Sequence, residues 1–181
     1  MRVTTTDTAL AADIDATCRL TGEFVLRSGQ VSNEYFDKYL FEADPQLLLR
    51  VAREMVRLLP DDTDLLGGLE LGGVPIATMV SSLTGRPALF VRKKAKEYGT
   101  CKLAEGPDVE GRRITLIEDV ITTGGAVLKS TEGLREIGKT VAHAVIVVDR
   151  EEGGRENLAR AGVEAHTLIN RTELKAYLAK R

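Results

Sequence analysis

The chain contains the stretch Ile114-Thr-Leu-Ile-Glu118-Asp119-Val-Ile-Thr122-Thr123-Gly124-Gly125-Ala-Val127. Its apolar start is typical of a buried strand. Two adjacent carboxylates, two hydroxyl side chains and two glycines follow before a helical pattern begins. Backbone N–H groups at the start of a helix bind anions with the help of the helix dipole, and glycines let an anion come close to the backbone. The stretch therefore predicts a strand, a phosphate-binding turn and a helix.

The side chains beside this turn indicate what else the ligand carries. Thr122 and Thr123 add hydrogen-bond donors for a phosphate, and Glu118 and Asp119 can hold hydroxyl groups or, through water, a magnesium ion. The turn thus suits a ligand with a phosphate on one side and a polyol on the other, such as a ribose 5-phosphate. An ordinary strand–turn–helix junction with a solvated acidic pair is the alternative. A Walker loop is excluded because no Gly-Lys-Ser/Thr follows, and the chain has no G-x-G-x-x-G fingerprint.

Length and composition predict one globular domain. The 181 residues are 43% hydrophobic and 29% charged, which is enough apolar material for a buried core. We expect a single domain over residues 1–181, in which residues 1–44 form an N-terminal helix and hood strands packed on the core. The net charge of −2 argues against a nucleic-acid partner, and no segment resembles a signal peptide or a membrane span. We therefore expect a cytoplasmic protein.

Cysteine and histidine are rare in this chain. Cys18 and Cys101 lie far apart, which argues against a disulfide framework and fits a reducing compartment. His143 and His166 each lie in an apolar, strand-like run. Because the sequence shows no Cys/His cluster, we expect core or edge histidines rather than a zinc site.

Predicted strands and helices alternate along most of the chain. Helices are predicted at 7–20, 46–59, 75–83, 126–137, 155–161 and 172–180, and strands at 23–26, 35–40, 65–69, 88–91, 113–117, 140–148 and 165–169. This alternation with continuous apolar strands indicates an α/β fold with a mostly parallel central sheet flanked by helices. Ligands of such sheets bind beyond the carboxyl ends of the strands. The candidate loops are therefore 70–73, 92–106, 118–125 and 149–154.

One of these loops is long and basic. It begins Arg92-Lys93-Lys-Ala-Lys96-Glu-Tyr98-Gly-Thr-Cys-Lys102, with five basic side chains in eleven residues. A mobile basic lid would neutralise a polyphosphate substrate, exclude water and reopen for release. A solvated charged loop is the alternative.

Three further turns carry polar or glycine residues. Gly72 lies in a turn that could cradle a second phosphate, or that could only be a tight turn before a helix. Arg150 follows a buried strand and could clamp a carboxylate with two hydrogen bonds, or form a surface pair with Asp149. The polar turn at 27–29 precedes the aromatic pair 35–36, which core packing would also explain.

Taken together, these residues resemble the type I phosphoribosyltransferases, and within that class the orotate phosphoribosyltransferases. The class motif matches residues 114–126, and further matches at 22–29, 92–99 and 149–152 carry the resemblance to the orotate enzymes. The resemblance covers nearly the whole chain. It implies the type I phosphoribosyltransferase fold, with a small N-terminal hood element on the mostly parallel sheet.

The resemblance also implies a reaction and partners. The substrates would be orotate and 5-phosphoribosyl 1-diphosphate (PRPP), and the products orotidine 5′-monophosphate and diphosphate, in de novo pyrimidine (UMP) synthesis. Mg²⁺ would be the cofactor, held mainly by substrate rather than by protein ligands. A homodimer with shared active sites is implied, with no nucleic-acid or membrane partner.

Residue roles follow from the same resemblance. The implied catalytic residues are Lys96, Asp119 and Glu118. The implied PRPP-binding residues are Arg92, Lys93, Lys96, Tyr98, Glu118, Asp119, Val120, Ile121, Thr122, Thr123, Gly124, Gly125, Ala126 and Gly72. The implied orotate-binding residues are Arg27, Ser28, Tyr35, Phe36, Thr122 and Arg150.

Several positions depart from the family pattern. Glu118 replaces a common Asp, Gly125 a Thr, Gly72 a Lys, Tyr98 a His and Arg27 a Lys. These changes concern rate and base preference rather than fold.

The alternative functions are a phosphoribosyltransferase for another base, such as uracil or a purine, and a noncatalytic PRPP-binding regulator. A structural α/β domain with incidental charged loops is a third, weaker alternative.

Overall fold

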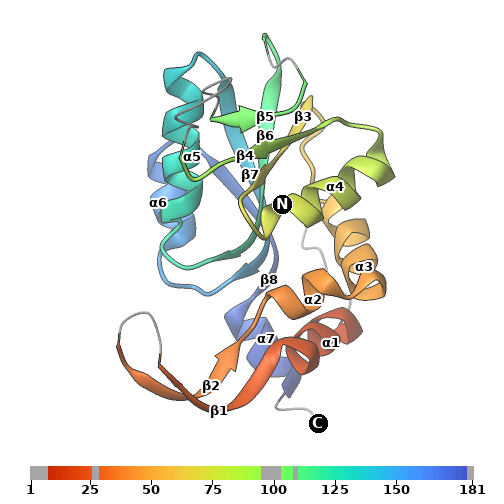
Figure 1. Cartoon of the computed structure of the whole chain (residues 1–181), viewed down its shortest axis with the longest axis vertical. Helices are drawn as coiled ribbons and strands as arrows, with labels where there is room; N and C mark the ends of the chain where they lie inside the picture. Colours follow the sequence, from red (N-terminus) through yellow and green to blue (C-terminus); the bar gives the residue numbers. More distant parts are fainter. Residues whose placement is uncertain (1–7, 26–28, 95–102, 108–109, 179–181) are drawn as a thin grey trace.

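The structure is a computed structural model that describes residues 8–25, 29–94, 103–107 and 110–178 (Figure 1). Helices and strands alternate from β3 onward as predicted, except that β4, β5 and β6 follow one another with no helix among the described residues between them. In chain order the elements are α1 (Thr8–Cys18), β1 (Arg19–Val25), β2 (Val31–Phe36), α2 (Tyr39–Ala43), α3 (Pro45–Val56), β3 (Leu65–Leu69), α4 (Gly73–Thr84), β4 (Ala88–Val91), β5 (Ala104–Glu105), β6 (Arg113–Ile121), α5 (Gly125–Glu136), β7 (Thr140–Asp149), α6 (Gly154–Arg160), β8 (Glu164–Asn170) and α7 (Arg171–Leu178).

A six-stranded sheet forms the centre of the molecule. Its strand order is β5-β4-β3-β6-β7-β8, and all neighbouring pairs are parallel except β4 with β5. The mostly parallel sheet predicted from the sequence is therefore confirmed. Because parallel strands share one direction, the carboxyl ends of β3, β4, β6 and β7 meet at one edge of the sheet.

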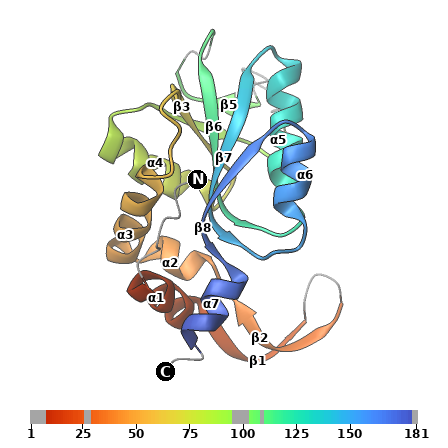
Figure 2. The same ribbon diagram turned by 180° about the vertical axis from the view of Figure 1, so that it is seen from behind.

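Helices cover both faces of this sheet, and each face has its own apolar core. Helices α3 and α4 lie on one face, and α5 and α6 lie on the other (Figures 1 and 2). Ile117 of β6 packs into the core on the first side with Met55 of α3. Its neighbour Leu116 points to the opposite face and packs into the second core with Leu134 of α5. This alternation explains why the central strands are apolar at nearly every position.

Helix α3 begins as the sequence predicts. Asp44 is its N-cap, and its Oδ1 atom accepts hydrogen bonds from the backbone N–H groups of Gln46 and Leu47 at 2.9 and 3.0 Å. Pro45 occupies the first helical position, where a missing N–H costs nothing. The helix therefore starts at a fixed point and places its apolar face on the sheet.

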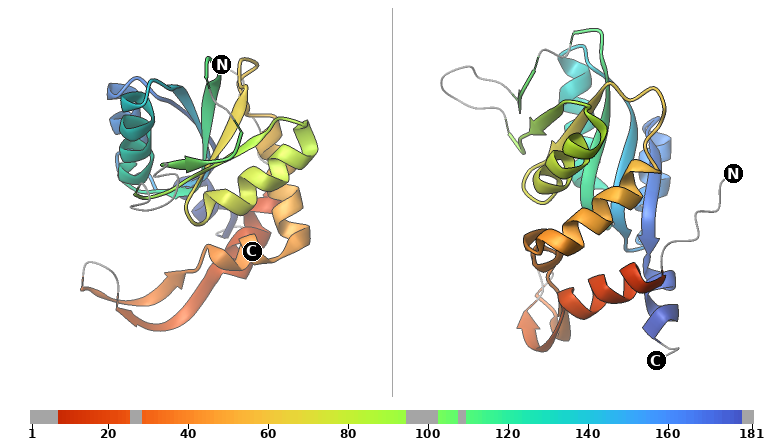
Figure 3. Two further views of the ribbon diagram at one scale, coloured as in Figure 1. Left: turned by 45° about the horizontal axis from the view of Figure 1, so that its top comes forward. Right: turned by 90° about the vertical axis from the view of Figure 1, so that its right-hand side faces the viewer.

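The N-terminal segment forms a separate layer at one end of the sheet. Strands β1 and β2 form an antiparallel hairpin, called here the hood hairpin, that extends away from the sheet (Figure 3). Helix α1 buries Leu10 and Ile14 in the same core as α3 and α7. The hood hairpin itself leaves the side chains of Val25 and Val31 exposed, at 75% and 61%.

Several bounds differ from those predicted. The helix predicted at 7–20 ends at Cys18, and the strand predicted at 23–26 begins at Arg19. The strand predicted at 35–40 ends at Phe36, because Asp37 accepts the N–H groups of Tyr39 and Leu40 and starts α2. Strand β6 runs past the predicted end at 117 to Ile121, because β7 continues beside it, and the acidic pair therefore lies inside the strand. Strand β5 was not predicted, since two residues carry no periodicity.

Among the elements of the described ranges, no helix is both long enough and apolar enough to cross a lipid bilayer.

Candidate active site

The predicted phosphate-binding turn, residues 122–125, lies between β6 and α5 and is open to solvent. The residues Thr122, Thr123 and Gly125 are exposed, whereas Gly124 is buried. Gly124 has φ of 79°, the left-handed conformation that glycine adopts without strain, and it begins α5. Asn157 of α6 donates from Nδ2 to the Thr123 carbonyl at 2.9 Å and holds the turn in place. The first N–H groups of α5 therefore face an open, fixed turn.

Behind this turn lies a group of three buried carboxylates, called here the carboxylate cluster: Glu42, Glu118 and Asp119. Their residues are 9%, 8% and 0% exposed. Lys38 compensates part of this charge, because its Nζ atom lies 2.6 Å from Asp119 Oδ2. One oxygen of each glutamate, Oε1 of Glu42 and Oε2 of Glu118, is buried without a hydrogen-bond donor in the described part of the chain.

Burial and mutual repulsion change the pKa values in this cluster. Burial, then repulsion from Asp119, raises the pKa of Glu42 from 4.5 to about 8. The same two causes raise the pKa of Glu118 well above its ordinary value. Burial alone would lower the pKa of Lys38, but attraction to Asp119 and their hydrogen bond outweigh burial and raise it. Glu42 therefore holds a proton at neutral pH while Lys38 stays charged.

The glycine turn after β3 packs directly against the carboxylate cluster. A Cβ atom on Gly72 would lie 1.7 Å from Asp119 Oδ2 and 2.6 Å from Glu42 Oε1. A side chain at this position would have to displace both carboxylates. The turn therefore contains glycine for a steric reason, beyond any role in binding a phosphate.

The basic loop begins after β4 and returns to the sheet at β5, and these two strands pair with each other. Val91 of β4 pairs with Ala104 of β5, and the Arg92 N–H donates to the Leu103 carbonyl at 2.9 Å. The side chain of Lys93 is exposed at the start of the loop. The predicted site residues Lys96 and Tyr98, like Arg27 and Ser28 of the polar turn, lie outside the described residues.

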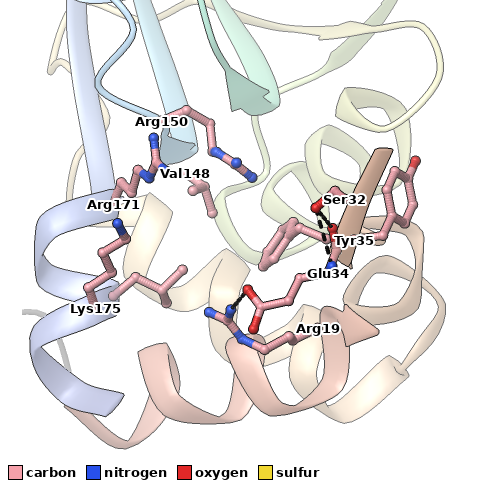
Figure 4. Close-up of a pocket in the computed structure, with 10 residues that line it drawn as sticks. Arg19, Ser32, Glu34, Tyr35, Val148, Arg150, Arg171 and Lys175 are labelled. Atoms are coloured by element: carbon pink, nitrogen blue, oxygen red, sulfur yellow. Dashed lines mark hydrogen bonds and ion pairs between the residues drawn. The ribbon is translucent and has the colours of Figure 1, made fainter. Parts of the chain in front are cut away.

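A pocket of about 380 Å³ lies between the hood hairpin, the end of β7 and α7 (Figure 4). It brings together Tyr35, Phe36 and Arg150, three of the residues implicated in orotate binding. The pocket is lined by Arg19, Ser32, Glu34, Tyr35, Phe36, Val148, Arg150, Arg171, Leu174 and Lys175.

A backbone hydrogen bond holds Arg150 in place, and its guanidinium carries a nitrogen that is unpaired within the described ranges. Its N–H donates to the carbonyl of Ile121 at 3.0 Å, which places it beside the phosphate turn. Its Nε atom is buried with no hydrogen-bond partner among the residues that the structure describes. Asp149 is 3% exposed and accepts the Glu151 N–H at 2.8 Å, so a surface Asp–Arg pair is wrong. A planar donor set is thus available for a ligand carboxylate.

Glu151 ties this end of β7 to the C-terminal helix. Its Oε2 atom accepts hydrogen bonds from the N–H and the hydroxyl of Thr172, at 2.9 and 2.6 Å. The segment that carries Arg150 is therefore anchored to α7, whose side chains line the other side of the pocket.

Sequence analysis missed two of the charged residues in this site. Lys38 and Glu42 were placed in or next to a predicted strand, which separates them from each other. Lys38 is the N-cap of α2 and Glu42 lies four residues further on within it, the spacing that puts two side chains on one side of a helix. Recognition of Asp37 as a turn residue would have revealed the helix and with it this pair.

Known proteins resemble this chain in sequence. Residues 42–164 match the family model described as phosphoribosyl transferase domain. The orotate phosphoribosyltransferase of Nocardioides sp. (strain ATCC BAA-499 / JS614) is 73% identical over 172 residues, which cover 95% of this chain and 96% of the relative.

Solved structures resemble it in fold. The orotate phosphoribosyltransferase of Mycobacterium tuberculosis H37Rv in complex with Fe(III) dicitrate has a TM-score of 0.83 at 31% identity, and the match covers 92% of this chain and 97% of that one. The structure of the same enzyme with PRPP has a TM-score of 0.79 at 28% identity, with 93% and 98% covered. These similarities extend over almost the full length of both chains, and the chain belongs to the phosphoribosyltransferase family and, within it, to the orotate phosphoribosyltransferases.

Proposed function

We propose that the protein transfers the 5-phosphoribosyl group of PRPP to orotate, which yields orotidine 5′-monophosphate and diphosphate in the synthesis of UMP. One observation carries this proposal. The exposed phosphate turn, the carboxylate cluster and Arg150 lie at the same edge of the sheet, which brings together groups suited to a phosphate, to ribose hydroxyls and to a ligand carboxylate.

The sugar part of PRPP would bind between the turn and the cluster. Its 5-phosphate would accept hydrogen bonds from the N–H and hydroxyl groups of residues 122–126. Its ribose hydroxyls would meet Asp119 and Glu118. Because Lys38 already pairs with Asp119 at 2.6 Å, the hydroxyls would share or replace that contact. Lys38 therefore becomes a further candidate for sugar positioning.

The base would occupy the pocket beneath the hood hairpin. The guanidinium of Arg150 can bind the orotate carboxylate with two hydrogen bonds, and Phe36 offers aromatic surface to the pyrimidine ring. The ring of Tyr35 points to the other side of β2 (Figure 4), so a contact of Tyr35 with the base would require this side chain to turn. The hydroxyl of Thr122 and the turn at Arg27 and Ser28 would complete the contacts with the base.

The chemistry needs electrostatic stabilisation more than a nucleophile. As the bond between the anomeric carbon and the diphosphate breaks, positive charge develops on the ribose and negative charge on the leaving group. The ionised Asp119 lies on the ribose side. Arg92, Lys93 and Lys96 would face the diphosphate, with Tyr98 beside them, and stabilise its charge. Closure of this loop would exclude water, which would otherwise compete with orotate for the ribose.

The residues at this edge fit a Mg²⁺ ion brought in with PRPP. A diphosphate near Gly72 would face Glu42 and Asp119, whose oxygens lie within 2.6 Å of where a Gly72 Cβ would be. A diphosphate bound there would repel the Asp119 carboxylate, and a cation relieves such repulsion. Carboxylate oxygens, directly or through water, are ligands that Mg²⁺ accepts. When bound, the ion would neutralise charge on the departing diphosphate.

A homodimer with shared active sites is part of the proposal. The hood hairpin and α2 expose the side chains of Val25, Val31, Tyr35, Tyr39 and Leu40, at 37–75%. A second copy of the chain is a suitable cover for apolar side chains gathered on one segment. In such a dimer the basic loop of one subunit could reach the site of its partner.

The reaction is tested by measuring orotate consumption by purified protein with PRPP, with and without Mg²⁺, beside uracil, hypoxanthine and guanine. We expect Mg²⁺-dependent loss of orotate and of no other base. Turnover of another base instead would assign the protein to that base. Saturable PRPP binding without any turnover would indicate a regulator, and failure to bind either substrate would indicate a structural domain.

The role of Arg150 is tested by Arg150→Lys. A lysine keeps the charge but cannot form two parallel hydrogen bonds, so kcat/KM for orotate should fall by about 10- to 100-fold. The KM for PRPP should change little. Arg53→Lys, on the exposed surface of α3, is the matched control. If kcat/KM fell equally for orotate and for PRPP, Arg150 would lie outside the orotate site.

Shared sites are tested with Lys96→Ala, in the basic loop of the sequence, and Asp119→Asn, in β6. Each variant should lose about 100-fold or more of the activity, because each removes a charge that faces the transition state. After subunit exchange, mixed dimers should regain part of the activity, since one of their two sites would hold both native residues. Verified exchange without recovery would contradict sharing.

The raised pKa of Glu42 predicts how stability varies with pH. Between 4.5 and about 8 the folded chain holds a proton that the unfolded chain has released. The free energy of unfolding should therefore fall as the pH rises through this window, by up to about 1.4 kcal/mol per pH unit for one such group. Glu42→Gln should make the dependence shallower, as measured by urea unfolding from pH 5 to 8.5. Glu132→Gln, at an exposed position of α5, is the control and should leave the pH dependence of stability as in the native chain. If the free energy of unfolding varied with pH equally in the native chain and both variants, Glu42 would ionise normally.

A further inference from the structure

A second group of chemically active side chains lies away from the active site. His143 is on β7, and Glu164 and His166 are on the neighbouring edge strand β8. The parallel register pairs His143 with Glu164 and Val145 with His166, so all three side chains point to the same face of the sheet. They lie near the amino ends of their strands, at the opposite edge from the phosphate turn. These are the only two histidines of the chain.

Three ligand atoms converge in this histidine cluster, defined as His143, Glu164 and His166. Nε2 of His166 lies 3.4 Å from Nδ1 of His143, and Oε2 of Glu164 lies 3.6 Å and 3.9 Å from these two nitrogens. The centre of this triangle is about 2.1 Å from each corner, which matches the bond lengths of about 2.0–2.2 Å that Zn²⁺ forms with imidazole nitrogen and carboxylate oxygen. The metal would need little movement of any side chain.

We infer that the histidine cluster binds one Zn²⁺ ion through Nδ1 of His143, Nε2 of His166 and Oε2 of Glu164, with water as the fourth ligand. The side chains of the histidines are 22% and 26% exposed, and that of Glu164 is 67% exposed. The site is therefore fixed on one side by the sheet and open to solvent on the other. Zn²⁺ suits this mixed set of ligands, whereas Mg²⁺ prefers six oxygens.

A fourth residue lies near the position of the outer hydrogen-bond acceptor that zinc-binding histidines usually have. Nε2 of His143 faces Oδ1 of Asp62 at 3.7 Å, so a metal on Nδ1 leaves the proton of the ring on the nitrogen that faces a carboxylate. Asp62 also lies 3.5 Å from Nη1 of Arg113 on β6. A bound ion would thus connect the α3–β3 loop, β7 and the edge strand β8.

The site is tested on the native protein by histidine-imidazole NMR and by calorimetry. One equivalent of Zn²⁺ should shift Nδ1 of one histidine and Nε2 of the other, and calorimetry should give one ion per chain. Mg²⁺ at the same concentration should shift neither ring. Histidine signals that stay unchanged at one equivalent of Zn²⁺ would overturn the proposal, even if zinc binds elsewhere on the protein.

Variants identify the ligands. His143→Gln, His166→Gln and Glu164→Gln should each weaken Zn²⁺ binding at least about tenfold. Glu164 is exposed, so its substitution leaves the packing of the sheet intact. Asp62→Asn should weaken binding less, and the adjacent, exposed Asp61→Asn should not change it. Native affinity in either histidine variant or in Glu164→Gln would refute the three-ligand site. Because no readout is enzymatic, the result is independent of the proposed reaction.

Discussion

The ion pair between Lys38 and Asp119 is the contact on which the architecture of the site depends. Asp119 has no exposed surface, and a buried carboxylate is tolerated only when an opposite charge or hydrogen bonds compensate it. Lys38 stands at the start of α2 and Asp119 near the end of the central strand β6. Their pairing therefore joins the N-terminal segment to the strand that carries the phosphate turn, and it keeps one ionised carboxylate where the ribose would bind.

The base pocket depends on the two ends of the chain meeting at one edge of the sheet. The hood hairpin supplies Tyr35 and Phe36, β7 supplies Arg150, and α7 supplies further basic residues. Glu151 holds β7 and α7 together through its two hydrogen bonds with Thr172. The sheet alone would therefore provide the phosphate turn and the carboxylates, but it would offer no enclosed place for the base.

Strand β7 carries functional side chains at both of its ends. His143 and Arg150 are seven residues apart, which corresponds to about 23 Å along a strand. The proposed zinc site and the proposed base site are thus at opposite edges of the sheet and share no side chain. The first would hold the edge strand β8 in place, while the second binds substrate, so each can be altered by mutation without direct contact with the other.

Local patterns were enough to determine the central strands, the phosphate turn and the N-cap of α3, since each depends on residues close together in the chain. Strands β3 and β4 have the predicted bounds for this reason. Only the tertiary structure decided that Lys38 and Glu42 lie beside Asp119, that Gly72 packs against two carboxylates, and that His143 meets His166. These contacts join residues that are distant in sequence. Strand register and helix docking bring them together, and neither leaves a periodic signal in the sequence.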